Sequence, residues 1–312
     1  MAKRQVIEPL SNGLNIDLAI EAASLHKNRL ARRLLWLNLA CYVLLSGTEL
    51  AIGYWTQAAA LLADGQNNLT GILSATLLLV GLHYAKLPRD TFHLEGHWQY
   101  EVLAVFLSGL LMVLVGLSCI WSAGWQTWQV LSAGRESLNL LASLTAGFSG
   151  GLLVIEALIN AYQGRRLQDS ALLASARDYF SDAITSGVTM VAITLAWLTH
   201  WYLIDTLTAL GLGAYICWNG GQILSQSATK LSNGFAPSKQ QQIVVLLAQH
   251  PAIQRVIYVN GRYVGDNLVL DIAVVVAPEL TVQATDQLRV QLEAQLAHQW
   301  SILYCCVEFR AS

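Results

Sequence analysis

Long apolar stretches alternate with short polar segments over the first three quarters of the chain. Each stretch is long enough to cross a bilayer as one helix, which takes about 20 residues. The apolar stretches cover residues 34–55, 58–85, 101–124, 138–162, 171–199 and 203–225. The pattern therefore predicts a membrane α-helical domain with six transmembrane helices. In the fourth stretch, Gly147, Gly150 and Gly151 favour a close approach to a neighbouring helix.

The hydrophobic pattern changes after about residue 230. Residues 238–251 and 281–300 have the period of amphipathic helices, and Thr281 is suited to cap the second of these. Residues 254–264, 267–277 and 301–309 read as strands. This order predicts a small α+β ferredoxin-like domain with the arrangement αββαβ. Such a small domain favours pairing with a second copy of the chain, so we expect a homodimer.

We therefore expect a cytosolic N-terminal segment (1–33), a six-helix transmembrane domain (34–229) and a cytosolic dimerisation domain (230–312). Composition supports the membrane assignment, because 54% of the residues are hydrophobic and only 12% are charged, whereas soluble domains have about a quarter charged residues. The net charge of −2 gives no reason to expect a nucleic-acid partner. The five cysteines form no CxxC motif, and the predicted spans carry no HExxH motif and no pairing of a nucleophile with a base, so we expect no enzyme activity.

Lysine and arginine residues gather in alternate polar segments. They lie in the N-terminal segment, in 86–100, in 163–170 and after residue 226, whereas the intervening loops contain only Arg135. Because cytoplasmic loops are enriched in Lys and Arg, both termini are expected on the cytoplasmic side of the cell membrane.

The fifth apolar stretch contains two acids, Asp178 and Asp182, four residues apart. On a helix both carboxylates lie on one face, one turn apart, where they repel each other and are costly to bury in lipid. A cation between the two carboxylates would relieve this cost. The alternative is that one acid lies at the membrane interface and is solvated, and the neighbouring Arg177 is compatible with that.

The second apolar stretch contains Asp64, Asn67 and Asn68. Asn67 and Asp64 share a helix face, and Asn67 together with Asp178 and Asp182 would form an all-oxygen cluster. Such ligands suit Mn²⁺, Mg²⁺ or Ca²⁺ better than Zn²⁺. The alternative is that the two asparagines only pair with backbone groups or neighbouring helices. For Glu49, in the first stretch, the simplest interpretation is a residue at the outer interface.

The polar segment 86–100 contains Asp90, His93 and His97, whose spacing fits a metal site if the segment is helical. Gly96 argues against a helix there, and an ordinary solvated loop is the alternative. Glu101 stands where an acid would compensate the N-terminal dipole of the third span.

Taken together, these features resemble the cation diffusion facilitator family. The resemblance rests on the six spans, the αββαβ tail and three segments, ALLADGQNNLTG (60–71), HLEGHWQYE (93–101) and RDYFSDAITS (177–186). It implies a homodimeric carrier that exports divalent metal ions from the cytoplasm in exchange for protons, by alternating access. The divalent cation is then the cargo, and no resident cofactor is expected.

Asn67 with Asp178 and Asp182 is similar to the manganese-exporting branch of that family, whose motif in the second span is Asn-x-x-x-Asp. The resemblance places Asp90, His93 and His97 at a second metal site and leaves Asp64 as a further candidate ligand. The chain departs from the motif at Gly71, where an acid is expected. The alternatives are therefore a degenerate, non-transporting paralogue that regulates an intact carrier, or a carrier for zinc, iron or cobalt. The tail lacks the histidines of zinc members, so we expect no metal site there.

Overall fold

The computed structural model describes residues 29–85, 87, 90–91, 93, 96–133, 138–167, 170–265, 267–300 and 302–311. These residues divide into two compact units. The first, the helical unit, contains described residues up to 80 and residues from 104 to 225. The second, the sheet unit, contains described residues from 81 to 103 and from 226 onward.

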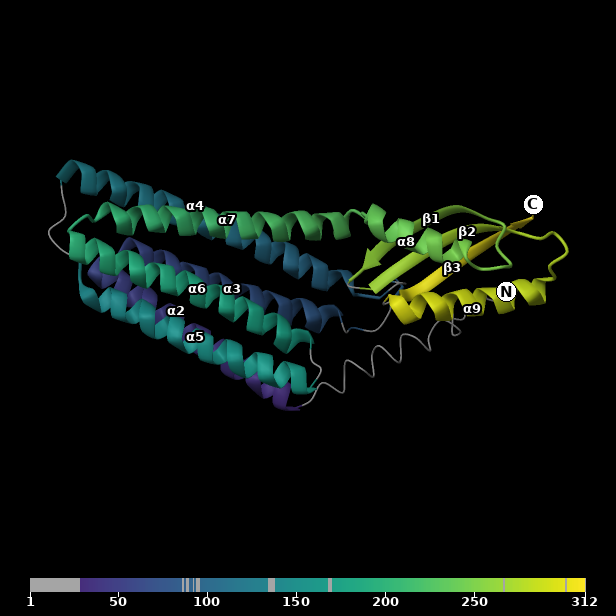
Figure 1. Cartoon of the computed structure of the whole chain (residues 1–312), viewed down its shortest axis with the longest axis horizontal. Helices are drawn as coiled ribbons and strands as arrows, with labels where there is room; N and C mark the ends of the chain where they lie inside the picture. Colours follow the sequence, from purple (N-terminus) through teal and green to yellow (C-terminus); the bar gives the residue numbers. More distant parts are fainter. Residues whose placement is uncertain are drawn as a thin grey trace, which may run out of the picture. The chain divides into compact units, whose positions relative to one another are not determined.

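Six long helices in the described residues correspond to the six predicted spans (Figure 1). They are α2 (Arg29–Thr56), α3 (Ala59–Ala85), α4 (Gln99–Ala133), α5 (Leu140–Leu167), α6 (Ser170–Thr199) and α7 (Leu203–Leu231). Helices α2 to α6 are long and apolar enough to cross a membrane. The third and sixth helices run further than predicted, to Ala133 and Leu231, because helix formation continues beyond the apolar stretch into residues that the hydropathy pattern excludes.

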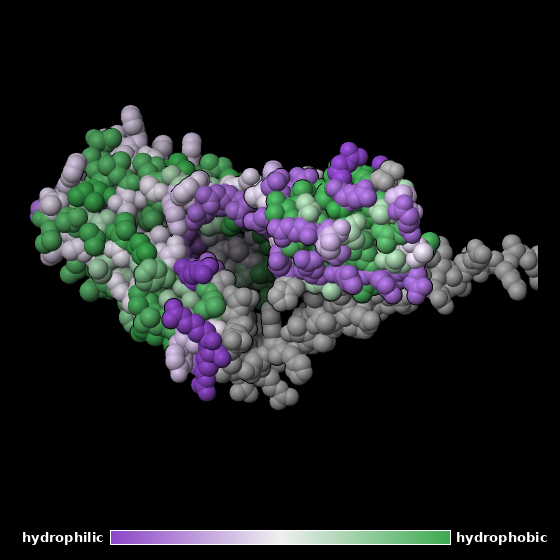
Figure 2. All heavy atoms as spheres, turned by 45° about the vertical axis from the view of Figure 1, so that its right-hand side comes forward, coloured by the Kyte–Doolittle hydropathy of each residue, from purple (hydrophilic) through white to green (hydrophobic). Residues whose placement is uncertain are grey.

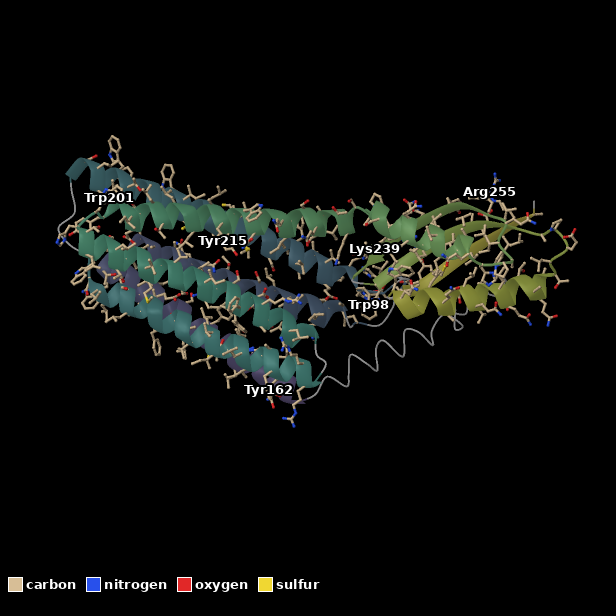
Figure 3. All side chains as sticks on the ribbon, in the orientation of Figure 1. Trp98, Tyr162, Trp201, Tyr215, Lys239 and Arg255 are labelled. Carbon is tan, nitrogen blue, oxygen red and sulfur yellow. The ribbon has the colours of Figure 1, made fainter. Side chains whose placement is uncertain are left out.

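The surface of the helical unit is suited to lipid. Large apolar side chains such as Leu158 (65% exposed) and Phe148 (67% exposed) point outward, and hydrophobic residues cover most of the face of the bundle seen in Figure 2. Trp201 and Tyr162 are exposed at opposite ends of the bundle (Figure 3). Trp and Tyr at both ends are typical of the two membrane–water interfaces.

Small residues bring helices of this unit close together. A Cβ added at Gly147 would lie 2.6 Å from Met190 Sδ, and one at Gly150 would lie 3.3 Å from Ser186 Cβ, so α5 and α6 approach closely. This confirms the prediction for these two glycines, whereas Gly151 faces open space. The close approach positions the α6 side chains against α5.

A buried aspartate fixes the start of α3. Asp205, in the first turn of α7, is fully buried, and its carboxylate accepts hydrogen bonds from Ala59 N and Ala60 N, each at 2.9 Å. The first backbone N–H groups of a helix have no partner within the helix and carry its positive dipole end, so a carboxylate there is stabilising. Asp205 therefore anchors the helix that carries Asp64 and Asn67.

The sheet unit has the predicted order αββαβ (Figure 1). Its elements are α8 (Pro237–Ala248), β1 (Arg255–Val264), β2 (Asn267–Val276), α9 (Val282–Gln299) and β3 (Ile302–Ala311). In the sheet order β1-β2-β3, β1 and β2 are antiparallel, and β2 and β3 are parallel. Thr281 caps α9 as predicted, by accepting a hydrogen bond from Ala284 N. Leu292 and Leu296, on α9, lie in the hydrophobic core of the sheet unit.

The polar segment before α4 is attached to this sheet. Trp98 packs against the small apolar cluster formed by Val264, Val269 and Leu303. Gln99 Nε2 donates a hydrogen bond to the carbonyl oxygen of Tyr263 at 2.8 Å. Gly265 adopts φ +67°, and a Cβ there would lie 3.0 Å from Trp98 Cβ, so glycine permits the close contact.

Candidate metal sites

Two helices, α2 and α3, contribute side chains that contact the carboxylate of Asp182, on α6. Asn67 Nδ2, on α3, donates a hydrogen bond to Asp182 Oδ1 at 2.9 Å, and the Tyr42 hydroxyl, on α2, donates to Asp182 Oδ2. Asn67 is 6% exposed. The structure thus brings together the second and fifth predicted spans through the residues that the sequence selected.

Asp178 lies one helical turn before Asp182 on α6, and its side chain is exposed whereas that of Asp182 is half-buried. Between them in sequence, Tyr179 is buried and packs its ring against Tyr42, with 4.9 Å between ring centroids. The acid pair therefore extends from the surface of the bundle to its interior. An ion could meet Asp178 first and then reach the Asn67–Asp182 contact.

Tyr42 stands beside the position where the expected acid is missing. A Cβ at Gly71 would lie 3.6 Å from Tyr42 Cε1 and 3.7 Å from Cζ, which is ordinary van der Waals contact. The phenol is thus close to the space into which an acidic side chain at this position would extend. Sequence reasoning missed Tyr42, because one tyrosine within an apolar stretch carries no signal until the helices pack.

Asp64 does not share the Asn67–Asp182 contact directly. It is fully buried, and its Oδ1 accepts a hydrogen bond from Thr185 Oγ1, on α6, at 3.2 Å. The interpretation of Glu49 as an interface residue is wrong, because this side chain is 0% exposed and accepts a hydrogen bond from Asn68 Nδ2 at 2.6 Å. It fails because residue 49 lies well inside α2, where neighbouring helices cover it. Asn68 therefore pairs with the neighbouring helix α2, which is the alternative given for it above.

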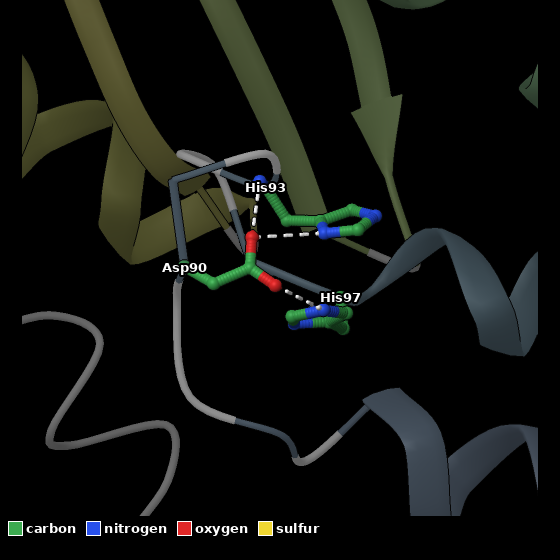
Figure 4. Close-up of side chains that lie close together, drawn as sticks. All are labelled: Asp90, His93 and His97. Atoms are coloured by element: carbon green, nitrogen blue, oxygen red, sulfur yellow. Dashed lines mark hydrogen bonds and ion pairs between the residues drawn. The ribbon is translucent and has the colours of Figure 1, made fainter.

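In the sheet unit, Asp90, His93 and His97 offer one ligand atom each within 4.8 Å of one another (Figure 4). Asp90 Oδ1 lies 3.0 Å from His93 Nδ1, and Asp90 Oδ2 lies 3.5 Å from His97 Nε2. Asp90 Oδ1 also accepts a hydrogen bond from His93 N at 2.6 Å. The three predicted residues therefore converge.

The way in which these residues meet differs from the helical spacing considered above. Gly96 adopts φ +90°, and its N–H donates to the carbonyl oxygen of His93 at 3.0 Å, so a tight turn brings the rings together. The centroids of the His93 and His97 rings are 4.1 Å apart, and Tyr100 stacks on His97. Two imidazoles and a carboxylate suit first-row transition metals, and the exposed side of the cluster leaves room for further ligands.

His97 is held by the surrounding fold. It is 6% exposed, and its Nδ1 is a buried atom without a hydrogen-bond partner among the described residues. The next residues, Trp98 and Gln99, attach the segment to the sheet as described above. The ring is thereby oriented before any ion arrives, which lowers the cost of binding.

Comparison with known proteins decides the family. The family model of the cation efflux transmembrane domain matches residues 35–232. The chain belongs to this cation efflux family, the cation diffusion facilitators. Manganese efflux system protein MneS of Bacillus subtilis is 30% identical over 267 residues, covering 86% of this chain and 91% of MneS. Uncharacterized transporter YdbO of the same organism is 28% identical over 274 residues, covering 86% of this chain and 91% of YdbO.

A further relative is the cation-efflux pump FieF of Klebsiella pneumoniae, which is 27% identical over 209 residues, covering 64% of this chain and 66% of FieF. The family and these relatives establish a multi-pass membrane protein that transports divalent metal cations and is not an enzyme. The resemblance to the manganese branch, drawn from Asn67 and the two aspartates, is confirmed.

Proposed function

We propose that this protein exports manganese from the cytoplasm in exchange for protons, and that Asn67, Asp178 and Asp182 bind the ion. The observation that supports the proposal is the 2.9 Å contact between Asn67 Nδ2 and Asp182 Oδ1. It joins two helices through polar groups, one of them an acid, that are costly inside a membrane and commonly mark functional sites there. Both side chains carry oxygens that can bind a hard cation.

The choice of manganese rests on the chemistry of the ligands and on the similarity of the chain to a manganese efflux protein. Carboxylate and amide oxygens suit Mn²⁺, and zinc selectivity would favour an imidazole or thiolate in this place. The relative MneS is named for manganese efflux. Zinc, iron and cobalt are the competing cargoes, and competition between these metals in a flux assay ranks them.

The present hydrogen bonds indicate what ion binding must change. Asp182 accepts from Asn67 and from Tyr42, so a cation can use only the remaining lone pairs of the carboxylate unless it displaces these donors. Rotation of the Asn67 carboxamide would present its oxygen instead of its nitrogen. After the helices rock to open the other side, a proton taken by the acid pair removes negative charge and helps to expel the ion.

The remaining parts of the proposal concern the cytoplasmic side. Both termini and the Asp90–His93–His97 cluster lie there, following the distribution of Lys and Arg. The cluster serves as a second divalent-cation site, and the sheet unit pairs two chains into a homodimer. Metal analysis of the purified protein, with anomalous scattering to place bound ions, tests the second site, and the molecular mass of the protein in detergent, measured by light scattering, tests the homodimer.

The direct test of the transport site is Asp182→Ala. We expect cells that carry this variant to lose manganese export, and therefore to accumulate manganese and lose manganese tolerance. Asp182→Asn keeps the size of the side chain and serves as the matched variant that removes only the charge. Unchanged export by a well-expressed Asp182→Ala protein would refute the site.

A second candidate function is that of a non-transporting partner of an intact carrier, and Gly71 favours it because the second-span motif lacks its acid. Purified protein in liposomes separates the two functions. Manganese flux through this chain alone excludes the partner role, and absence of flux from a folded, metal-binding protein favours it.

A further inference from the structure

A second polar cluster lies in the helical unit, around Glu49 on α2 and Asp64 on α3. Both side chains are 0% exposed. Asp64 precedes Asn67 by three residues, which is about 4.5 Å along the helix axis at 1.5 Å per residue. The offset is toward the Ala59 end of α3, the end that Asp205 caps. We call this cluster the Glu49–Asp64 site.

Several oxygens of this cluster are buried and have no hydrogen-bond partner among the described residues. They are Glu49 Oε1, Asp64 Oδ2, Asn68 Oδ1, Ser149 Oγ and Ser186 Oγ. Ser149 lies beside Glu49 and Ser186 beside Asp64, and the two carboxyl groups are near enough to interact electrostatically. A buried polar atom without a partner destabilises the fold, and more so where it is charged. The native protein therefore requires something that compensates these oxygens.

The neighbouring helices provide no basic side chain for this purpose. On α3 the histidine is His83, at the opposite end, and on α5 Arg165 and Arg166 lie in the last turn. Arg177 on α6 is more than two turns away from Thr185, the residue that contacts Asp64. Compensation by an internal salt bridge is thereby excluded for the described parts of these helices.

We propose that the Glu49–Asp64 site binds a divalent cation, which the carrier holds there on its way out. Glu49, Asp64 and Asn68 would supply carboxylate and amide oxygens, with hydroxyl oxygens from Ser149 and Ser186. The inference rests on the proposed function, because with cytoplasmic termini this end of α3 faces the outside. The ion would pass from Asn67 and Asp182 to a second station about one helical turn further along.

A hydroxyl group stands between the two stations. Thr185 Oγ1 lies 3.2 Å from Asp64 Oδ1 and 2.7 Å from the carbonyl oxygen of Asp182. It has one hydrogen and can donate it to only one of these acceptors at a time. An ion bound by Asp64 would release the Thr185 hydrogen to the Asp182 backbone, so occupation of one station alters the hydrogen bonding of the other.

A divalent cation fits the cluster better than protons do. Two carboxylates carry two negative charges, which one divalent ion neutralises. Amide and hydroxyl oxygens around them are ligands that hard cations accept.

The experiment counts Mn²⁺ bound to full-length protein in nanodiscs, in a His93→Ala/His97→Ala background that removes the loop site. Equilibrium dialysis gives the stoichiometry. Because the stations are close, electron paramagnetic resonance reports whether two Mn²⁺ ions on one chain broaden each other's signal. We expect two ions per chain in the background protein, and one ion with a sharpened signal in Glu49→Gln.

Glu156→Gln is the matched control, because Glu156, on α5, is also a buried acid but has the thiol of Cys41 beside it instead of a second carboxylate. It should retain two ions. If Glu49→Gln fails to give monodisperse protein, Ser186→Ala replaces it, because this variant removes one unpartnered hydroxyl. We expect it to lower the affinity for the second Mn²⁺ about tenfold, because one ligand oxygen is lost.

Two ions bound by folded Glu49→Gln, or unchanged affinity in Ser186→Ala, would overturn the second station. Asp182→Asn separates this failure from failure of the proposed function. Loss of one ion in Asp182→Asn but not in Glu49→Gln leaves the transport site standing without the second station. Loss of one ion in Glu49→Gln but not in Asp182→Asn leaves the Glu49–Asp64 site standing and refutes the transport site at Asp182.

Discussion

Replacing Gly71 by Asp, with and without the hydroxyl of Tyr42, tests whether the tyrosine substitutes for the missing acid. The replacement fits, since a Cβ at Gly71 makes only ordinary contact with the Tyr42 ring. In the presence of Tyr42 the new carboxylate competes with Asp182 for the one phenol hydrogen, and the carboxylate that accepts it binds a metal ion less strongly. In a Tyr42→Phe background the carboxylate has no such partner and is free to bind the ion.

The hydrogen bond sets the size of the effect. A hydrogen bond to a charged group contributes about 1.5–3 kcal/mol, and each 1.4 kcal/mol is about tenfold in affinity. We therefore expect Gly71→Asp to raise Mn²⁺ affinity about 10- to 100-fold more in the Tyr42→Phe background than in the native one. Isothermal titration of the four proteins, with the loop histidines His93 and His97 replaced by Ala, measures this coupling.

Gly71→Asn provides the control, because it adds nearly the same volume without the charge. We expect it to give a much smaller gain in both backgrounds. If Gly71→Asp gives the same gain with and without the Tyr42 hydroxyl, the two positions are independent and the compensation by Tyr42 is refuted.

Three other predictions follow from single contacts. Asp205→Ala should lower the thermal unfolding temperature in detergent, because two charge-assisted hydrogen bonds of about 1.5–3 kcal/mol each are lost. The unfolding temperature of Asp205→Asn should lie between those of the native protein and Asp205→Ala. Equal stability of all three proteins would contradict the cap. His97→Ala should abolish the visible spectrum of Co²⁺ bound at the loop, and a retained tetrahedral spectrum would refute this ligand set. Maleimide at neutral pH should label exposed Cys306 but not Cys305, because burial raises the pKa of the Cys305 thiol to about 12; rapid labelling of both in folded protein would contradict it.

The span pattern could be predicted because lipid imposes length and apolarity on each helix separately. The stretches chosen by hydropathy agree with α2, α3, α5 and α6 within a few residues at most ends. The tail was equally predictable, because Thr281 and the leucine stripe are local signals of α9. The errors occur at the ends of α4 and α7, where a helix continues without an apolar signal.

The candidate sites were only partly accessible from sequence. Gly96 argued against a helix between His93 and His97, but the residue spacing did not show that the two rings would meet. Glu49 was misread because burial inside a bundle depends on which neighbours cover the residue. Its contact with Asn68 joins two helices and cannot be inferred from one of them.

The sequence by itself determined which residues have chemistry unsuited to lipid, namely the aspartate pair of α6 and the polar residues of α3, since helical period places each set on one face. Only the tertiary structure decided their partners. Packing of α2, α3 and α6 gives Asp182 its contacts with Asn67 and Tyr42, and separates Asp64 into another cluster. The physical reason is that helix geometry is local, whereas the compensation of a buried charge depends on groups that other helices bring to it.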